Sequence, residues 1–147
     1  MSGLDRDTVT GLTLASWGRR VGATVFDGLV LLIPEIVIYL GVGNASLFYT
    51  LLSIALQGGY LVWFLSRPLG QTIGNRIVKT RVVQATSGAS LEFATSWKRW
   101  FIMALLNVSL YLGVGLVLLP LDYLWPLWDK RRQTLHDKFA GTIVVMI

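Results

Sequence analysis

The chain has 147 residues, of which 54% are hydrophobic and only 14% are charged. Ordinary soluble domains carry about a quarter charged residues, so this composition excludes a typical soluble domain and a disordered chain. The absence of cysteine and the single histidine exclude disulfides, thiolate sites and multi-histidine zinc or haem ligation. A net charge of +5 suits either nucleic-acid binding or a membrane protein with basic flanks, and the placement of the charges decides between them.

Two long apolar runs come first along the chain. Residues 21–42 contain only two charges, Asp27 and Glu35, and would form a helix about 33 Å long, enough to cross a hydrocarbon core of about 30 Å. Residues 45–65 contain no charge at all. Because a two-residue segment separates the runs, we expect a tight helical hairpin. The first run is too long for a signal-peptide core, so we expect it to be retained.

A third apolar run, residues 100–128, contains one charge, Asp122. As a single straight helix it would be about 43 Å long, well beyond the thickness of the hydrocarbon core. The segment Gly113-Val114-Gly115 interrupts the run and allows a bent hairpin with arms at residues 95–112 and 116–130. The sequence therefore leaves open three spans or four.

Basic residues predict the orientation, because Lys and Arg concentrate on the cytoplasmic side of membrane proteins. All 13 lie in the first 20 residues, in residues 66–99 and in residues 130–138. We expect a cytoplasmic N-terminal segment at residues 1–15 and one membrane domain at residues 16–147. We expect the chain to cross a membrane several times, with both termini in the cytoplasm. Since membrane flanks account for the basic residues, we expect no nucleic-acid partner.

Two segments rich in β-branched residues predict a small β element. They are residues 76–83 and residues 142–147. Because each would otherwise expose unpaired backbone groups, we predict that residues 77–83 pair with residues 142–146 on the cytoplasmic face. Ser90 is predicted to cap the helix that follows. The expected fold class is an all-α polytopic membrane protein with three to four transmembrane helices and a small cytoplasmic two-stranded β element.

Asp27 is the most informative charged residue. It follows Arg20 by seven positions, so both lie on one helix face about 10 Å apart. An ionised carboxylate at that depth costs several kcal/mol unless it is paired, hydrated or protonated. It is either a buried structural acid or a proton or cation site. Arg20 and Asp27 are too far apart to touch, and their candidate partners are Arg99, Lys138 and Asp137. We predict that Arg20 lies near Asp137.

Three sequence blocks resemble the RDD family of small prokaryotic membrane proteins, which is named for one arginine and two aspartates. RRVGATVFD at residues 19–27 resembles the opening block, GQTIGN at residues 70–75 the next block, and QTLHDKFAGTIVV at residues 133–145 the closing block. By this resemblance the signature residues are Arg20, Asp27 and Asp137, and the implied location is a prokaryotic plasma (inner) membrane. The candidate supporting residues are Arg99, His136, Lys138, Gly70 and Gly74. The chain departs from the family at Asn75, where members usually have a basic residue.

No motif for catalysis or cofactor binding stands out. GQTIGN is rich in glycine, but no Lys-Ser/Thr follows it, so it is interpreted as a tight turn in which Gly70 and Gly74 let backbones approach. Nothing resembles a nucleophile elbow. We therefore expect no enzyme activity, no cofactor and no metal site.

The resemblance to the RDD family implies two classes of function. Some members are associated with sodium/proton antiport, and many occur beside other membrane machinery. Because the chain is short and shows no inverted repeat, the preferred hypothesis is an accessory or assembly subunit that packs against a larger membrane complex. Its expected partners are the lipid bilayer and either that complex or further copies of the chain. The alternative is a small cation/proton or ligand transporter that uses Asp27; the sequence assigns no role to Glu35 or Asp122.

Overall fold

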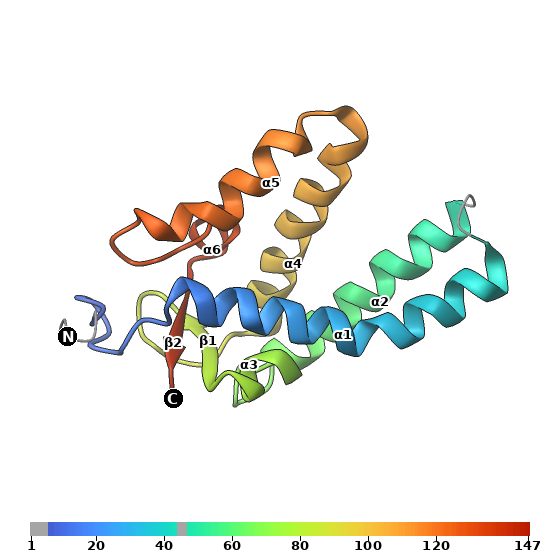
Figure 1. Ribbon diagram of the computed structural model, residues 1–147. Helices are drawn as coiled ribbons and strands as arrows, with labels where there is room; N and C mark the ends of the chain where they lie inside the picture. The colour runs from blue at the N-terminus through green and yellow to red at the C-terminus, as the bar shows by residue number, and fades with distance from the viewer. Residues whose placement is uncertain (1–5, 44–46) are drawn as a thin grey trace.

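Two helical hairpins diverge from a two-stranded sheet in the computed structural model, which describes residues 6–43 and 47–147 (Figure 1). The first hairpin consists of α1 (Trp17–Val42) and α2 (Leu47–Leu65), and the second of α4 (Phe93–Val108) and α5 (Gly115–Leu124). The short helices α3 (Ile73–Ile77) and α6 (Leu135–Ala140) lie near β1 (Thr80–Gln84) and β2 (Thr142–Met146). Two 3-10 turns, Ser109–Leu112 and Trp125–Leu127, follow α4 and α5.

By length and composition, α1 and α2 are the two candidate membrane-spanning helices in the described part of the chain. Helix α1 begins after Ser16, whose hydroxyl accepts a hydrogen bond from the Arg19 N–H, and it ends at Gly43, where φ is +74°. Asn44 and Ala45, within the predicted turn and second run, lie outside the described residues. Large apolar side chains of α1 point outward along its length, which suits contact with lipid (Val25, Leu29, Ile33, Val37 and Leu40).

The third apolar run bends into a hairpin, so the alternative of one long helix is wrong. The chain turns at Gly113, where φ is +77°, and Gly115 lies so close to Leu110 that an added Cβ would be 2.6 Å from its Cα. The α-helical arms are shorter than the predicted arms at residues 95–112 and 116–130, because each ends in a 3-10 turn.

The prediction that Ser90 caps the helix after β1 is wrong. Glu92 is the N-cap residue of α4, and the Ser90 hydroxyl donates instead to the Pro68 carbonyl oxygen at 2.5 Å.

The predicted strand pairing is confirmed. Strands β1 and β2 are antiparallel, with Val82 opposite Val144. The first strand begins at Thr80 rather than three residues earlier, because α3 and a turn occupy the preceding residues. The N-terminal segment covers the other edge of β2, since the Met146 N–H donates to the Thr13 oxygen at 2.8 Å. Both edges of β2 are therefore hydrogen-bonded.

The hydrophobic core lies on the two faces of this sheet. One face packs Val83, Ile143 and Val145 with Leu14 and Ala85. The other face packs a second set of buried side chains, Ala15, Leu65, Val82, Leu91 and Val144. Because Leu65 is the last residue of α2, this second cluster packs the end of the first hairpin against the sheet.

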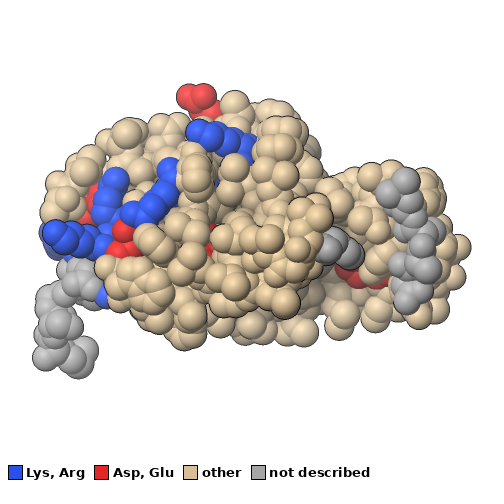
Figure 2. Space-filling model, turned by 90° about the horizontal axis from the view of Figure 1, so that it is seen from above, with Lys and Arg blue, Asp and Glu red and all other residues tan. Residues whose placement is uncertain are grey.

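Charge is distributed unevenly along the molecule. Figure 2 shows Lys and Arg side chains over the end that carries the strands, and none on the visible face at the tip of the first hairpin. The sequence contains no Lys or Arg between residues 21 and 66 or between residues 100 and 129. The cationic residues of the hairpin helices are therefore confined to the first turns of α1 (Arg19 and Arg20) and the N-terminal half of α4 (Lys98 and Arg99).

Glycines bring α3 against α1 and the α2–α3 turn against β1. A Cβ atom at Gly74 would overlap the carbonyl oxygen of Ala23 and lie 2.8 Å from the carboxyl carbon of Asp27. Gly70 has a φ of +58°, and a Cβ there would lie 2.5 Å from the Val82 oxygen. The close backbone approach expected at both glycines is therefore present.

The Gly74→Ala substitution is predicted to destabilise the fold by about 1–3 kcal/mol, because backbone rather than a flexible side chain occupies the space that its Cβ needs. The Gly28→Ala substitution in α1 is the matched control, since a Cβ there meets nothing within 4 Å. It should be neutral or slightly stabilising. Thermal unfolding of the detergent-solubilised proteins measures both effects. Equal melting temperatures for the two variants would contradict the predicted contact.

Candidate functional site

The carboxylate of Asp137 is fully buried at the start of α6, where its own segment holds it in place. A capping box joins it to Thr134: the Asp137 N–H donates to Thr134 Oγ1 at 3.1 Å, and the Thr134 N–H donates to Asp137 Oδ2 at 3.2 Å. The Thr142 hydroxyl of β2 donates to Asp137 Oδ1 at 3.0 Å. The acid is therefore positioned by local structure on both sides of its helix.

Two arginines from different hairpins converge on this carboxylate. Arg20 Nη1 of α1 lies 2.6 Å from Asp137 Oδ2, and Arg99 Nη1 of α4 pairs with Asp137 Oδ1. Arg99 also donates to the Thr142 hydroxyl at 2.8 Å. Each arginine side chain is only 10% exposed. The predicted proximity of Arg20 and Asp137 is confirmed, and one carboxylate joins both hairpins to α6 and β2.

Asp122 and His136 form a second buried pair beside the first. The Asp122 carboxylate of α5 accepts the His136 backbone N–H at 2.9 Å and lies 2.7 Å from His136 Nδ1. Because a carboxylate accepts, Nδ1 carries the proton. Burial and the positive charge of Arg99 lower the pKa of His136 to about 4, against the opposing effect of Asp122. A neutral His136 therefore attaches α5 to α6, and this is the role of Asp122 that the sequence left open.

Asp27 is held by neutral hydrogen-bond donors. Its Oδ1 accepts from the Tyr60 hydroxyl at 2.5 Å and from the Gly74 N–H at 2.7 Å, and its Oδ2 accepts from the Thr72 hydroxyl at 2.7 Å. The expectation of a partner among Arg99, Lys138 and Asp137 is wrong for this residue. Asp27 instead ties α1 to α2 and to the first turn of α3.

Two ion pairs lie at the more exposed edge of the cluster. Lys138 pairs with Asp129 rather than with a signature residue. Arg131 binds the buried Asp7 through Nε at 2.6 Å and Nη2 at 2.9 Å. These hydrogen bonds hold the pKa of Asp7 well below its usual range. This pair has no signal in the sequence, because its members are 124 positions apart and follow no motif.

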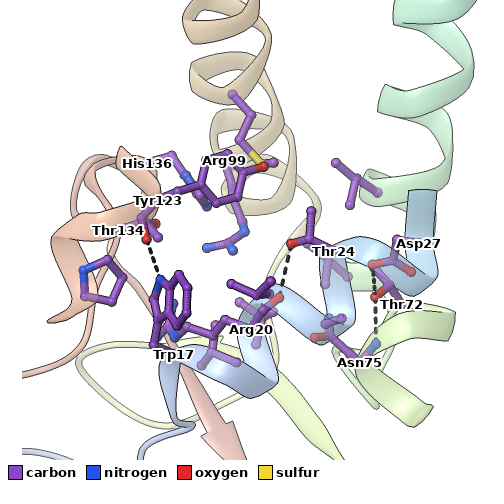
Figure 3. Close-up of a pocket in the computed structure, with 18 residues that line it drawn as sticks. Trp17, Arg20, Thr24, Asp27, Thr72, Asn75, Arg99, Tyr123, Thr134 and His136 are labelled. Atoms are coloured by element: carbon purple, nitrogen blue, oxygen red, sulfur yellow. Dashed lines mark hydrogen bonds between the residues drawn. The ribbon is translucent and has the colours of Figure 1, made fainter. Parts of the chain in front are cut away.

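A cavity of about 90 Å³ lies between the Asp137 cluster and Asp27. In Figure 3, Arg20 and Arg99 lie in its middle part, between two groups of labelled residues. One group contains Trp17, Tyr123, Thr134 and His136, and the other contains Thr24, Asp27, Thr72 and Asn75. Asn75, where the family usually has a basic residue, is buried and accepts a hydrogen bond from the Thr80 hydroxyl at 3.0 Å.

Glu35 lies farther along α1 and is separate from this cavity. Its two oxygens accept from the Ser53 hydroxyl at 2.6 Å and from the Gln57 side chain at 3.2 Å, both on α2. The α1–α2 hairpin therefore contains two carboxylates, Asp27 and Glu35, each hydrogen-bonded to the facing helix.

The two apolar helical hairpins, joined at a basic end by buried charged residues, are those of a membrane-associated protein. The chain belongs to the RDD family, whose model matches residues 14–141. A proline-rich antigen homologue of Mycobacterium tuberculosis is 33% identical over 91 residues, covering 60% of this chain and 34% of the relative. The proline-rich antigen of Mycobacterium leprae is 29% identical over 110 residues, covering 73% and 39%. The chain thus spans little more than a third of these curated relatives. No solved structure matches it.

The depressed pKa of His136 predicts a pH-dependent stability. Unfolding restores an ordinary pKa of 6.5, so the unfolded chain takes up a proton between pH 6.5 and about 4 while the folded chain does not. Stability from this residue is complete above pH 6.5 and is lost as the pH falls. The free energy of unfolding should drop by about 1 kcal/mol between pH 7.5 and 5.5.

Thermal unfolding across that pH range checks this prediction, and His136→Asn is the comparison variant. Asparagine keeps a donor for Asp122 and removes the titrating ring, and the chain has no other histidine. The variant should show a much flatter pH profile. A wild type that is equally stable at both ends of the range would contradict the buried neutral imidazole.

Proposed function

We propose that the chain is a non-enzymatic integral membrane protein that acts as an accessory or assembly subunit and packs against a larger membrane complex. The observation that carries the proposal is that Asp137 and Asp27 bond to other helices of the same chain. Asp137 binds two arginines, and Asp27 accepts three hydrogen bonds from α2 and the α3 segment. Carboxylates engaged in this way serve as ties between helices, which favours a scaffold over a carrier.

In the proposed arrangement both hairpins enter the membrane from the cytoplasmic side, where both termini lie. The absence of Lys and Arg from residues 21–66 and 100–129 supports this orientation. The second hairpin is short for crossing a membrane. The 13 helical residues of Gly115–Leu127 extend only about 20 Å, whereas the hydrocarbon core of a bilayer is about 30 Å thick. A short span needs a thinned bilayer or a neighbouring protein, and this favours packing against a partner.

A groove on α2 and α4 is a suitable contact for a partner helix. Its volume is about 540 Å³, and Ala55, Gly59, Trp63 and Trp97 are among its lining residues. A Cβ at Gly59 would meet nothing within 4 Å, so the helix surface is open there. Small residues four positions apart let two membrane helices approach closely, and aromatic rings add contact area.

Copurification in a gentle detergent tests this proposal. The wild-type chain should be isolated with a larger membrane protein at a constant ratio. The Gly59→Leu substitution should fill the groove and abolish that association while the chain itself keeps its yield and melting temperature. The Gly28→Leu control places the same side chain at an open position of α1 and should retain the partner. Isolation of the wild type only as a monomer or as copies of itself, even after crosslinking in native membranes, would contradict the proposal.

The alternative function is a small cation/proton or ligand transporter that uses Asp27. The observation in its favour is that Asp27 lines the same cavity as Arg20, while Glu35 is a second carboxylate farther along α1. Two acidic side chains two helical turns apart in an apolar hairpin are a suitable arrangement for passing a proton or a cation.

The Asp27→Asn substitution separates this alternative from the scaffold. The amide oxygen can still accept from Tyr60 and Gly74, and the Thr72 hydroxyl can turn to accept from the amide N–H, so the variant should fold. A transporter should lose pH-gradient-driven sodium flux in reconstituted vesicles. Absence of wild-type flux for several cations would exclude transport by the chain alone. Flux that persists in the variant would exclude Asp27 as the carrier and make Glu35 the next candidate.

A further inference from the structure

Arg20 is buried but only partly satisfied. Its Nη1 atom pairs with Asp137, whereas Nε and Nη2 have no hydrogen-bond partner among the described residues. The side chain is 90% buried, so bulk water does not solvate these two donors fully. Buried guanidinium N–H groups without an acceptor are costly, and an acceptor is therefore expected in the adjoining cavity, which Arg20 lines.

The charge around the cavity favours an anion as that acceptor. Arg20 and Arg99 line the cavity against one carboxylate, Asp27, among the described residues, whereas Asp137 and Asp122 are not among its lining residues. The nearby Asp122 directs its oxygens to His136, and Asp27 at the far end already accepts three hydrogen bonds. The cavity of about 90 Å³ has room for a small anionic group or several water molecules.

We propose that this cavity binds a phosphate group, with Nε and Nη2 of Arg20 as a two-pronged donor. The planar guanidinium presents these neighbouring N–H groups in the geometry that two phosphate oxygens accept. Arg20 lies three residues after Trp17, where α1 begins, at the basic end of the molecule. The phosphate belongs either to the headgroup of an anionic phospholipid or to a free anion. The lipid source rests on the proposed membrane orientation, which puts Arg20 at headgroup depth, whereas the free anion does not.

Native mass spectrometry of the delipidated protein in detergent, with three probes, tests the proposal and identifies the source. Phosphatidylglycerol should bind as one retained copy, and diacylglycerol, which has the same chains without the phosphate, should not. Inorganic phosphate is the third probe. If millimolar phosphate displaces the lipid or binds alone, the site takes free phosphate; if it does neither, the site takes the lipid headgroup. Equal retention of both lipids together with no binding of phosphate would overturn the proposal and leave water as the occupant.

The Arg20→Lys substitution tests the residue itself. Lysine keeps the positive charge for Asp137 but lacks the planar fork, so phosphate-dependent binding should weaken by roughly tenfold or more. The control is Arg76→Lys, an exposed residue of α3 away from the cavity, which should bind as the wild type does. Unchanged binding by a folded Arg20→Lys variant would overturn the assignment.

A further measurement on the wild type covers the case in which Arg20→Lys does not fold. Phosphate or phosphatidylglycerol should raise the melting temperature above that in chloride of equal ionic strength, because a ligand of the folded state stabilises it. No shift with either probe would overturn the proposal. Copurification of the larger partner does not depend on this site, so a failure here is distinguishable from a failure of the proposed function.

Discussion

The buried carboxylate of Asp137, shared by Arg20 and Arg99, is the interaction on which the rest of the structure depends. It joins one helix from each hairpin to α6 and β2, in a region that water reaches poorly. Loss of one member of such a group leaves an uncompensated buried charge, which costs about 3–5 kcal/mol. The hairpins also meet where α2 packs against α4, since a Cβ at Gly58 of α2 would lie 2.5 Å from the Trp100 ring of α4. The cluster and the contact between α2 and α4 together set where the two apolar hairpins meet.

A second set of polar contacts joins the helices within the first hairpin. Asp27 is too far along α1 to reach the Asp137 cluster, and it uses Tyr60, Thr72 and the Gly74 N–H instead. The absence of a side chain at Gly74 is what lets that N–H approach a carboxylate on another helix. Arg20, Asp27 and Asp137 thus connect helices inside the fold, and the exposed faces of α1 are apolar. Arg20 is the exception, because two of its donors have no hydrogen-bond partner among the described residues.

Local patterns in the sequence were sufficient for several features of the fold and the site. Matched β-branched segments predicted the pairing of β1 with β2, and the proximity of Arg20 and Asp137 followed from two opposite charges in apolar surroundings. Thr134 and Asp137, three positions apart, form a capping-box pattern, which is a sequence signal for the start of α6. The partners Tyr60 for Asp27 and Asp7 for Arg131 had no such signal, because neutral hydroxyls are common and long-range pairs follow no fixed spacing.

The sequence by itself determined that the chain is apolar and helical, where its basic residues lie and which charged residues interrupt its apolar runs. These properties depend on composition and on short-range spacing, which any fold of the chain retains. Only the tertiary structure decided that the third run bends and that Asp27 is held by neutral donors. It also decided that Arg20 lines a cavity and that two of its nitrogens have no partner among the described residues. The physical reason is that a buried polar group takes whichever partner the packing brings within about 3 Å, and packing is set by contacts between residues far apart in the chain.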